Sequence, residues 1–595
     1  NNRIDFSGFI IRLSNRLFPA AFIVLLISGI ISIFLLPQLD WEHTIKELFA
    51  SALYFENWQL AFSSVDYLAE NNSATPFQHF WAMSIQGQFY IIWPILLLVS
   101  ILLAKYIFKK SVKFTFLITI VLVFVSSLTY SIYLTNLNQP WAYFNTFTRV
   151  WEFGLGGLVA LLISNIVIKK GPSIVLGWLG LIGLVSCGLL LQVSTVFPGY
   201  AALWPTLSAV FILIAGNKGG KLGVHRLLSS KPLVKLGSIS YGFYLWHWPL
   251  LIFYYHITGN NVASIADGII IIILSALLAY LTINFIEKPL RNLHFSSKSR
   301  AAALSVSFII PVVILSVLWG GYLKVLQESS NNNLALAEDD VAFNQEVGFA
   351  PSLLDVKDDI PFSYNDGCHQ TPYESDVIEC EYGEIINPTY TVALVGGSHV
   401  AHWFPAFVEF AKSENIRLLN YTKSGCRFTT EFDYSQNKAA LKSCEEWNDK
   451  LTDILIDTKP DLVFTTANAT DVEGIPSGYI PKWKMLDEED IQIFALRDNP
   501  RFPFDVPSCI EKHGENSSLC TIDRETILPN DIWDDTNVPN NVHYIDLSDY
   551  FCDEDVCKPV VDDILIYRDK HHITATFAKS LAPVMQEKVY SILEN

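Results

Sequence analysis

The chain of 595 residues is long enough for several domains. Hydrophobic residues make up 51% of it and charged residues only 17%, and its mean hydropathy is positive, a balance typical of a membrane protein rather than of a large soluble enzyme. The formal net charge of −18 argues against a role in binding nucleic acid.

Long apolar runs fill the first 323 residues of the chain. An α-helix rises about 1.5 Å per residue, so about 20 apolar residues cross the roughly 30 Å hydrocarbon core of a bilayer. The segment 48–65 is too polar to span, and we expect it to be interfacial or re-entrant. The remaining runs predict nine membrane helices, at residues 17–36, 89–104, 114–134, 151–168, 174–191, 200–215, 239–257, 265–286 and 301–323.

The loops between these runs alternate in charge. One set is nearly free of basic residues, with Lys46 and Arg149 as exceptions. The positive-inside rule assigns the other, basic set to the cytoplasm, and nine crossings from there place everything after residue 323 outside. The basic set consists of Arg12, Arg16, Lys105, Lys109, Lys110, Lys113, Lys169, Lys170, Lys218, Lys221, Arg226, Lys231, Lys235, Lys288, Arg291, Lys298 and Arg300.

Cysteine placement supports the same topology. Of the nine cysteines, Cys187 lies in an apolar run and is interpreted as a small core residue. The others follow the last span, and an even number confined to one domain favours disulfides in an oxidising compartment. Zinc is the rival interpretation, but no CxxC pair or Cys/His ligand spacing is present. Sequential pairing is the simplest arrangement, although sequence alone does not fix connectivity; the candidates are Cys368, Cys380, Cys426, Cys444, Cys509, Cys520, Cys552 and Cys557.

Several polar side chains lie at or near membrane depth, where they are costly and are usually functional or paired. Arg149 and Glu152 flank the start of one predicted span, and His247 lies near the middle of another. Arg12 and Arg16, four residues apart, share one helix face at a cytoplasmic entry. Topology anchoring is an alternative interpretation of these two arginines, and a packed structural histidine is an alternative interpretation of His247.

Four motifs in this half resemble the acyltransferase 3 family of membrane acyltransferases. Residues 9–19 read FIIRLSNRLFP, residues 81–94 read WAMSIQGQFYIIWP, residues 239–249 read ISYGFYLWHWP and residues 285–291 read FIEKPLR. Each motif is weak by itself. Their common order over roughly 290 residues makes the resemblance specific.

The resemblance implies a domain that moves acyl groups, commonly acetyl, from a cytoplasmic donor to extracytoplasmic glycans. The histidine proposed as catalytic in the family lies in an earlier span, and since the chain opens with Asn1 rather than Met, we expect that segment to lie outside this sequence. Leu13 stands where a second arginine is common, and Gln86 where glutamate is usual. The membrane-domain candidates are Arg12, Arg16, Gln86, Gln88, Arg149, Glu152, Tyr244, His247 and Glu287.

Beyond an acidic linker at 324–362 the pattern becomes α/β. An apolar strand at 391–395 is followed by Gly396-Gly397-Ser398 and by a helical stretch at 400–411, which places a serine hydroxyl at a strand end near a helix N-terminus that favours developing negative charge. Further strands are expected at 416–421, 462–466 and 543–547. A closing helix is expected at 575–593, with Thr574 as its N-cap.

A nucleophilic serine needs a base, and the base needs a group that orients it. Asp569 and His572 stand three residues apart just before the closing helix, so the carboxylate can turn back to the imidazole; His571 is the competing base. The order Ser398, Asp569, His572 resembles the SGNH hydrolase family, although Gly397 replaces the aspartate usual before the serine. The resemblance implies that Gly425 and Asn468 supply oxyanion donors.

Together these features predict a multi-span α-helical membrane domain followed by an extracytoplasmic α/β domain of the SGNH hydrolase-like, flavodoxin-like three-layer type. The predicted parts are an acyltransferase 3 domain of about eight spans, N-terminally incomplete (1–300), a last transmembrane helix (301–323), a periplasmic linker (324–362) and the SGNH-like domain (363–595).

The predicted function is O-acetyl transfer across the bacterial inner membrane to an envelope glycan. Acetyl-CoA is the expected acyl donor, with no bound cofactor or metal. Lipopolysaccharide O-antigen is the expected acceptor and peptidoglycan the second choice; the bilayer is the other expected partner. A membrane-anchored glycan O-acetylesterase and a transporter with an accessory domain are the alternatives. Nine spans exceed what a tether needs, which argues against the esterase.

Overall fold

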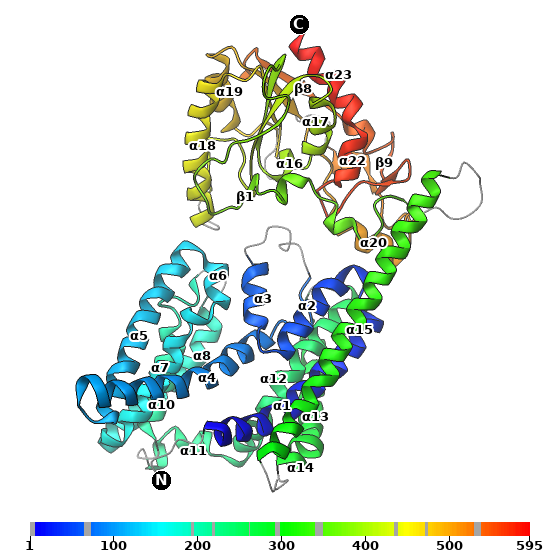
Figure 1. The fold of residues 1–595 in the computed structure, drawn as a ribbon. Coiled ribbons are helices and arrows are strands. Elements are labelled where there is room, and N and C mark those ends of the chain that lie inside the picture. The colour runs from blue at the N-terminus through cyan, green and yellow to red at the C-terminus, as the bar shows by residue number, and fades with distance from the viewer. Residues whose placement is uncertain are drawn as a thin grey trace. The chain divides into compact units, whose positions relative to one another are not determined.

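Figure 1 shows the computed structural model of the chain, which describes residues 6–64, 73–191, 196–216, 220–260, 262–291, 298–339, 349–433, 438–469, 474–528, 533 and 537–594. The chain divides into two compact units, one of Asn1–Leu36 with Asp40–Leu323 and one of Pro37–Leu39 with Lys324–Asn595. The first is helical and the second is an α/β domain. The predicted fold class is confirmed.

The helices of the first unit coincide with the apolar runs. They are α1 (Phe6–Leu35), α2 (Trp41–Ala52), α3 (Glu56–Ser63), α4 (Phe80–Leu103), α5 (Val112–Leu137), α6 (Gln139–Phe144), α7 (Val150–Leu162), α8 (Lys170–Leu190), α10 (Leu203–Ala215), α11 (His225–Leu228), α12 (Lys231–Thr258), α13 (Ile265–Thr282), α14 (Lys288–Arg291) and α15 (Lys298–Asp339).

Within the described residues, seven helical segments are long and apolar enough to cross a membrane, which supports a multi-span membrane protein. Two of the nine predicted spans differ from the expectation. The helix α10 has 13 residues and so rises only about 20 Å, less than the hydrocarbon core. The helix α12 has 28 residues, but its tyrosine, tryptophan and histidine side chains lower its hydropathy.

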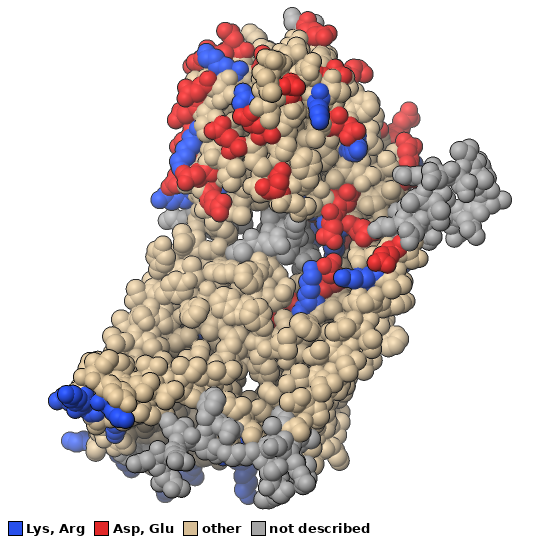
Figure 2. All heavy atoms as spheres, viewed as in Figure 1, with Lys and Arg blue, Asp and Glu red and all other residues tan. Residues whose placement is uncertain are grey.

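The charge distribution of this unit agrees with membrane insertion. Figure 2 shows Lys and Arg gathered at one end of the helical unit, whereas its visible flank carries almost no charge. Large apolar side chains are exposed on that unit, among them Ile91, Ile95 and Leu98 at helical spacing on α4. An exposed apolar flank is stable against lipid, where a charged side chain is costly.

Two polar segments of the prediction have more structure than expected. The stretch 48–65 was expected to be interfacial or re-entrant, and its described part lies in the short helices α2 and α3. The linker predicted from residue 324 continues α15 as a helix as far as Asp339. Further on, Val356 is fully buried in the core of the α/β unit, so this part of the predicted linker belongs to that domain.

The second unit is built on a seven-stranded sheet. Its order is β1-β4-β3-β5-β6-β8, and β2 pairs with β4 antiparallel. The other neighbours in this order are parallel. The strands are β1 (His369–Gln370), β2 (Cys380–Gly383), β3 (Tyr390–Gly396), β4 (Ile416–Lys423), β5 (Leu462–Thr466), β6 (Gln492–Leu496) and β8 (Val542–Ile545).

Alternating side chains of the strands form two cores. Val392 and Leu394 of β3 pack on one face with α17 (Phe404–Ala411), α22 (Ala575–Ser580) and α23 (Ala582–Leu593), whereas Ala393 and Val395 pack on the other with α18 (Lys438–Thr458) and α19 (Tyr479–Asp487). Figure 1 shows the helices on both faces of the sheet. A parallel sheet covered on both faces is the expected three-layer arrangement.

Smaller elements complete this unit. They are the helices α16 (Ser398–Ala401), α20 (Val506–His513) and α21 (Arg524–Ile527), and the two-stranded pairs β7–β9 (Ile522–Asp523 with Val556–Cys557) and β10–β11 (Val560–Val561 with Ile564–Leu565).

Two predicted helices are each divided by a proline. The stretch 400–411 is divided at His402 and Trp403 into α16 and α17, and the closing helix is divided at Leu581 into α22 and α23. Pro405 and Pro583 lie in the first turn of α17 and α23, where a proline begins a helix because it lacks the amide that an interior turn needs. Thr574 caps α22 as predicted, accepting a hydrogen bond from the Phe577 amide.

The four sequential disulfides that the sequence suggested as the simplest arrangement are present. They join Cys368 to Cys380, Cys426 to Cys444, Cys509 to Cys520 and Cys552 to Cys557, and Cys187 is free. All four lie in the α/β unit.

The Cys426–Cys444 disulfide should stabilise the α/β unit most clearly, because both sulfurs are buried and the bond closes a loop with a sequence separation of 18. A loop of about this size implies roughly 3 kcal/mol. We expect Cys426→Ser/Cys444→Ser in the full chain to lose hydrogen-exchange protection in β3 and β4, and Cys509→Ser/Cys520→Ser to lose less. Peptide mapping without reduction checks the pairing; equal losses in both double variants would contradict the expectation.

Candidate active site

The sheet gathers the ends of four strands at one edge. The strands β3, β4, β5 and β6 are parallel, so their carboxyl ends lie at the same edge. Ser398 follows β3, Gly425 follows β4, Asn468 follows β5 and Asp498 follows β6. Because β4 and β5 lie on opposite sides of β3, Ser398 lies where the strand order changes direction, the usual place of a binding crevice in an open α/β sheet.

The structure brings Ser398, His572 and Asp569 together in one hydrogen-bonded chain. The Nε2 of His572 lies 2.9 Å from the Ser398 Oγ, and its Nδ1 lies 2.7 Å from the Asp569 Oδ2. The Asp569 Oδ1 accepts the backbone amides of His571 and His572, both at 2.8 Å. With Nδ1–H directed at a carboxylate, His572 presents an unprotonated Nε2 to the serine, as a general base must.

Burial and hydrogen bonding determine the protonation states of these three residues. Ser398, Asp569 and His572 are 6%, 5% and 1% exposed. Burial lowers the pKa of His572, although the hydrogen bond to Asp569 opposes this, so the resting imidazole is neutral. Burial alone raises the pKa of Asp569, but the hydrogen bond from His572 and the charge of the nearby Arg568 lower it overall, so the carboxylate stays ionised. The arrangement suits nucleophilic attack by the serine.

The two predicted oxyanion donors lie on turns at the same sheet edge. Gly425 has a positive φ of 62°, and its turn approaches the nucleophile, since a Cβ on Gly397 would lie 3.3 Å from the carbonyl oxygen of Cys426. That close contact explains a glycine where the resemblance leads one to expect aspartate. Asn468 accepts the amide of Asp498 at 2.8 Å through Oδ1, which leaves its amide NH₂ as a donor. Their role as oxyanion donors stays a prediction.

The helix-dipole part of the prediction is weaker in the structure. Ser398 opens α16, which has four residues, so the expected long helix does not begin at the nucleophile. A single turn carries little of the macrodipole of a full helix.

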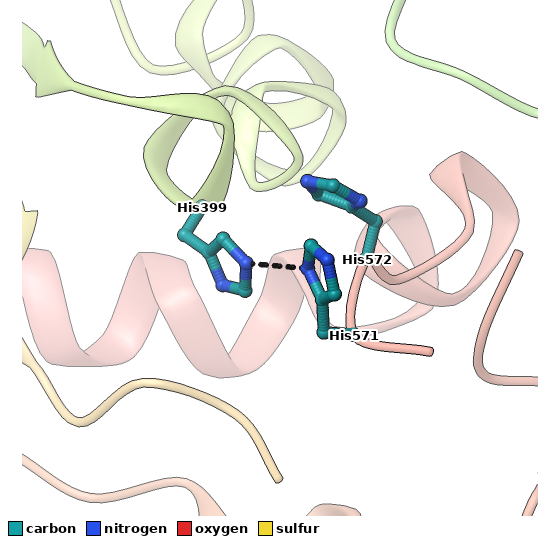
Figure 3. A group of neighbouring side chains, drawn as sticks. All are labelled: His399, His571 and His572. Atoms are coloured by element: carbon teal, nitrogen blue, oxygen red, sulfur yellow. Dashed lines mark hydrogen bonds between the residues drawn. The ribbon is translucent and has the colours of Figure 1, made fainter. Parts of the chain in front are cut away.

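A second Asp–His pair stands beside the first. The Nδ1 of His399 lies 2.6 Å from the Asp498 Oδ1, and its Nε2 lies 2.9 Å from the His571 Nδ1 (Figure 3). The rings of His571 and His572 are 4.1 Å apart between centroids. Sequence reasoning missed Asp498 because it did not predict β6; the largely apolar run 491–496, with Asp498 two residues beyond it, was the available signal.

The histidines can also be assessed as metal ligands. Among the described residues, His399, His571 and His572 each offer one nitrogen within 4.8 Å of the others. Two of these rings already direct a nitrogen at a carboxylate, a common support for a metal-bound histidine. The opposite ring nitrogens are also engaged: His399 Nε2 contacts His571 Nδ1, and His572 Nε2 contacts Ser398 Oγ. A metal here would therefore compete with the Ser398–His572 contact.

The membrane-domain candidates form separate groups. Arg149 is bonded to Glu152 at 3.1 Å and to the Tyr143 carbonyl, and Gln88 bonds Asn57 and Thr146. Tyr244 donates to the His79 carbonyl, and the His247 Nδ1 lies 2.7 Å from the Tyr244 carbonyl. Of the other candidates, Gln86 bonds Tyr90, Glu287 is buried, and Arg12 and Arg16 are exposed on α1.

Buried acidic residues in the helical unit were missed by the sequence reasoning. Glu47 and Glu56 are 1% and 0% exposed, and Glu47 lies 2.8 Å from the His43 Nε2 and accepts from Thr75. The signal was present as two acids and a histidine in a short stretch between apolar runs. Buried carboxylates in a membrane unit are candidates for function by the same reasoning as Arg149.

Two family models match the chain. The one described as an acyltransferase domain matches residues 1–284, and the one described as an SGNH domain fused to AT3 domains matches residues 367–587.

Curated relatives match about half of the chain. YrhL of Bacillus subtilis (strain 168) is 28% identical over 308 residues, 50% of this chain and 47% of the relative. The peptidoglycan O-acetyltransferase OatA of Listeria monocytogenes serovar 1/2a is 26% identical over 358 residues, 56% of each chain. The O-acetyltransferase OatA of Staphylococcus aureus (strain MRSA252) is 27% identical over 334 residues, 53% of each. The chain thus spans about half the length of these relatives.

One solved structure also matches, the periplasmic domain of a lipopolysaccharide acetyltransferase of Salmonella ser. Paratyphi A. The sequence identity is 15%, the match covers 34% of this chain and 85% of that chain, and the TM-score is 0.29, too low for the likeness to bear on function.

His369 should make the α/β unit sensitive to acid. It holds the turn that carries Gly425, because its Nε2 lies 2.9 Å from the Ser424 Oγ, and burial, Arg568 and Lys423 lower its pKa to about 3. The unfolded chain takes up a proton below about pH 6.5 while the folded chain does not, so stability is full above that pH and falls as the pH drops toward 3, by up to about 1.4 kcal/mol per pH unit.

We therefore expect the full chain to lose hydrogen-exchange protection in β3–β5 between pH 7 and pH 5, after correction for intrinsic exchange, and His369→Gln to lose less over that interval. The same loss in both proteins would contradict this role of His369.

Proposed function

Because this chain belongs to the acyltransferase 3 proteins that carry a fused SGNH domain, we propose that it is an O-acetyltransferase acting on a glycan of the bacterial envelope. The observation that carries the proposal is the hydrogen-bonded chain Asp569–His572–Ser398 at the carboxyl edge of the sheet. The names of the relatives support the same reaction class.

The first half of the reaction is acylation of Ser398. His572 Nε2 takes the proton as Oγ attacks the acyl carbon, the bond between that carbon and the donor breaks, and Asp569 stabilises the imidazolium. Backbone and amide N–H groups near Gly425 and Asn468 would stabilise the oxyanion. In the second half an acceptor hydroxyl attacks the acyl carbon, the bond from that carbon to Ser398 Oγ breaks, and Oγ regains its proton.

The membrane half delivers the acyl group in this proposal. Acetyl-CoA on the cytoplasmic side is the donor, and the helical unit carries the group across the cytoplasmic membrane to the outer side, where the α/β domain lies. The disulfides favour an oxidising compartment for that domain, and the basic loops favour the opposite side for the helix ends that they join. In this proposal Arg149, Glu152 and the buried Glu47 are candidate residues for that transfer.

Peptidoglycan is the acceptor that the relatives favour, since one is named as a peptidoglycan O-acetyltransferase. Lipopolysaccharide O-antigen, which the sequence placed first, becomes the second choice. Both glycans offer sugar hydroxyls on the outer side of the membrane, so the chemistry at Ser398 is the same for either.

Ser398→Ala and His572→Ala should abolish acetyl transfer from acetyl-CoA to glycan in membrane vesicles, because each removes an atom that reacts or moves the proton. Asp569→Asn should lower it by about 10⁴-fold, since an amide no longer fixes the tautomer of His572. Ser413→Ala, at an exposed serine of the same domain, is the control and should keep full activity. Full activity in all three site variants would exclude the acyl-enzyme.

Deletion of the gene should remove O-acetyl groups from the glycan that is the acceptor. NMR of purified peptidoglycan and of O-antigen from the deletion strain and its parent identifies it, and we expect the loss in peptidoglycan. An increase of O-acetylation in the deletion strain would instead identify an esterase.

A further inference from the structure

Beside His572, the proposed base for Ser398, lies a second hydrogen-bonded series of titratable residues: Asp498, His399 and His571. Building on the proposed O-acetyl transfer, we propose that this chain is a proton relay for the acceptor: His571 takes the proton of the attacking sugar hydroxyl, His399 receives the proton that His571 passes on, and Asp498 stabilises the charge. His571 would then be a catalytic residue, and His399 and Asp498 positioning residues.

The hydrogen bonds fix the direction of this relay. Burial alone would raise the pKa of Asp498, but the hydrogen bonds from His399 and Arg501 and the charge of Arg501 lower it overall, so the carboxylate is ionised. The carboxylate therefore accepts from His399 Nδ1–H at 2.6 Å, which leaves His399 Nε2 as an acceptor. The 2.9 Å contact from Nε2 to His571 Nδ1 then requires the proton on His571 Nδ1. That tautomer of His571 has a lone pair on Nε2, where a hydroxyl can donate.

The outer end of the relay is the accessible one. His571 and His399 keep partial exposure, whereas His572 is buried. Within the described residues, no hydrogen bond engages His571 Nε2. His571 also lies directly beside the base, with ring centroids 4.1 Å apart, so a hydroxyl bound at His571 approaches the acyl group on Ser398. Figure 3 shows His399 and His571 facing each other across their hydrogen bond, with His572 adjacent.

The inner end is built to hold a charge. Asp498 accepts from His399, from the amide of Asn499 at 3.1 Å and from Arg501 Nη2 at 2.8 Å, and its own amide is fixed by Asn468. Asp569 holds His572 in the same way, through one ring nitrogen and two amides. Two imidazoles, each oriented by a buried carboxylate, thus lie within 5.1 Å of each other between ring centroids.

Two bases are useful when the group that transfers the acyl to Ser398 departs as an anion, as p-nitrophenolate does in the assay below. After acylation His572 holds the proton of Ser398 and is no longer a base. The acceptor hydroxyl then gives its proton to His571 Nε2, while the Nδ1 proton of His571 moves to His399 Nε2. The new oxygen–carbon bond forms, the bond from the acyl carbon to Ser398 Oγ breaks, and Oγ recovers its proton from His572. The proton left on His399 returns through His571 to solvent, where it balances the donor anion.

The test separates the two halves of the reaction in the full chain in detergent, and each measurement is made without and with EDTA. p-Nitrophenyl acetate, whose leaving group departs as an anion, acylates Ser398 and reports the first half as a burst of p-nitrophenolate. Transfer of acetyl to a soluble glycan oligosaccharide reports the second half. The variants are His571→Gln, His399→Gln and Asp498→Asn, with His513→Gln at an exposed position as the matched control.

We expect the three relay variants to keep the burst rate of the parent protein and to lose roughly 10²- to 10⁴-fold in the transfer rate, with the KM for the oligosaccharide little changed. Asp498→Asn belongs in this group because its NH₂ can donate to His399 Nδ1 and reverse the tautomer that accepts from His571. His513→Gln should be unchanged in both halves.

Three results would overturn the relay. Burst and transfer falling together would show that these residues only support the position of Ser398. Unchanged transfer would show that His572 serves both halves. Loss of parental transfer on adding EDTA would make the histidine cluster a metal site. Failure of the proposed function itself is a different result, since the parent protein would then show neither a burst nor transfer.

Discussion

Two buried carboxylates determine how the α/β unit is arranged around Ser398. An ionised carboxylate in a protein interior is stable only when donors replace the water that it has lost. Asp569 and Asp498 each have three such donors, one of which is a histidine ring nitrogen. Each carboxylate therefore fixes one imidazole in orientation and in tautomer. Groups that are held in place before a substrate arrives are what a nucleophilic serine requires.

The parallel sheet brings these carboxylates to the nucleophile. Asp498 follows β6, two strands away from β3, and it reaches His399 only because the carboxyl ends of parallel strands share an edge. Asp569 and His572 come from the loop before α22, which packs on one face of the same sheet with α17. Residues separated by 174 positions thus meet within one hydrogen bond. The disulfides close short loops around this framework and leave the long-range order to the sheet.

In the helical unit the charged groups of the interior are dispersed, whereas in the α/β unit they are clustered around Ser398. Its outer surface is apolar, and charged groups are held inside by neighbours: Arg149 by Glu152, a carbonyl and aromatic rings, and Glu47 by His43 and Thr75. In a medium without water each such group needs a partner within the protein. These interior groups are spread over several helices, in contrast to the single hydrogen-bonded cluster around Ser398.

The sequence by itself predicted the class of each half, seven of the nine spans, the strands β3, β4, β5 and β8 and the residues Ser398, Asp569 and His572, because hydrophobic periodicity, charge alternation and short motifs are local properties. It also suggested the disulfide pairs, since each joins neighbouring cysteines in the chain. Only the tertiary structure decided that Asp498 joins His399, that His571 links the two dyads and that Glu47 and Glu56 are buried. The physical reason is that these relations depend on strand order and helix packing, which bring together residues that no local pattern connects.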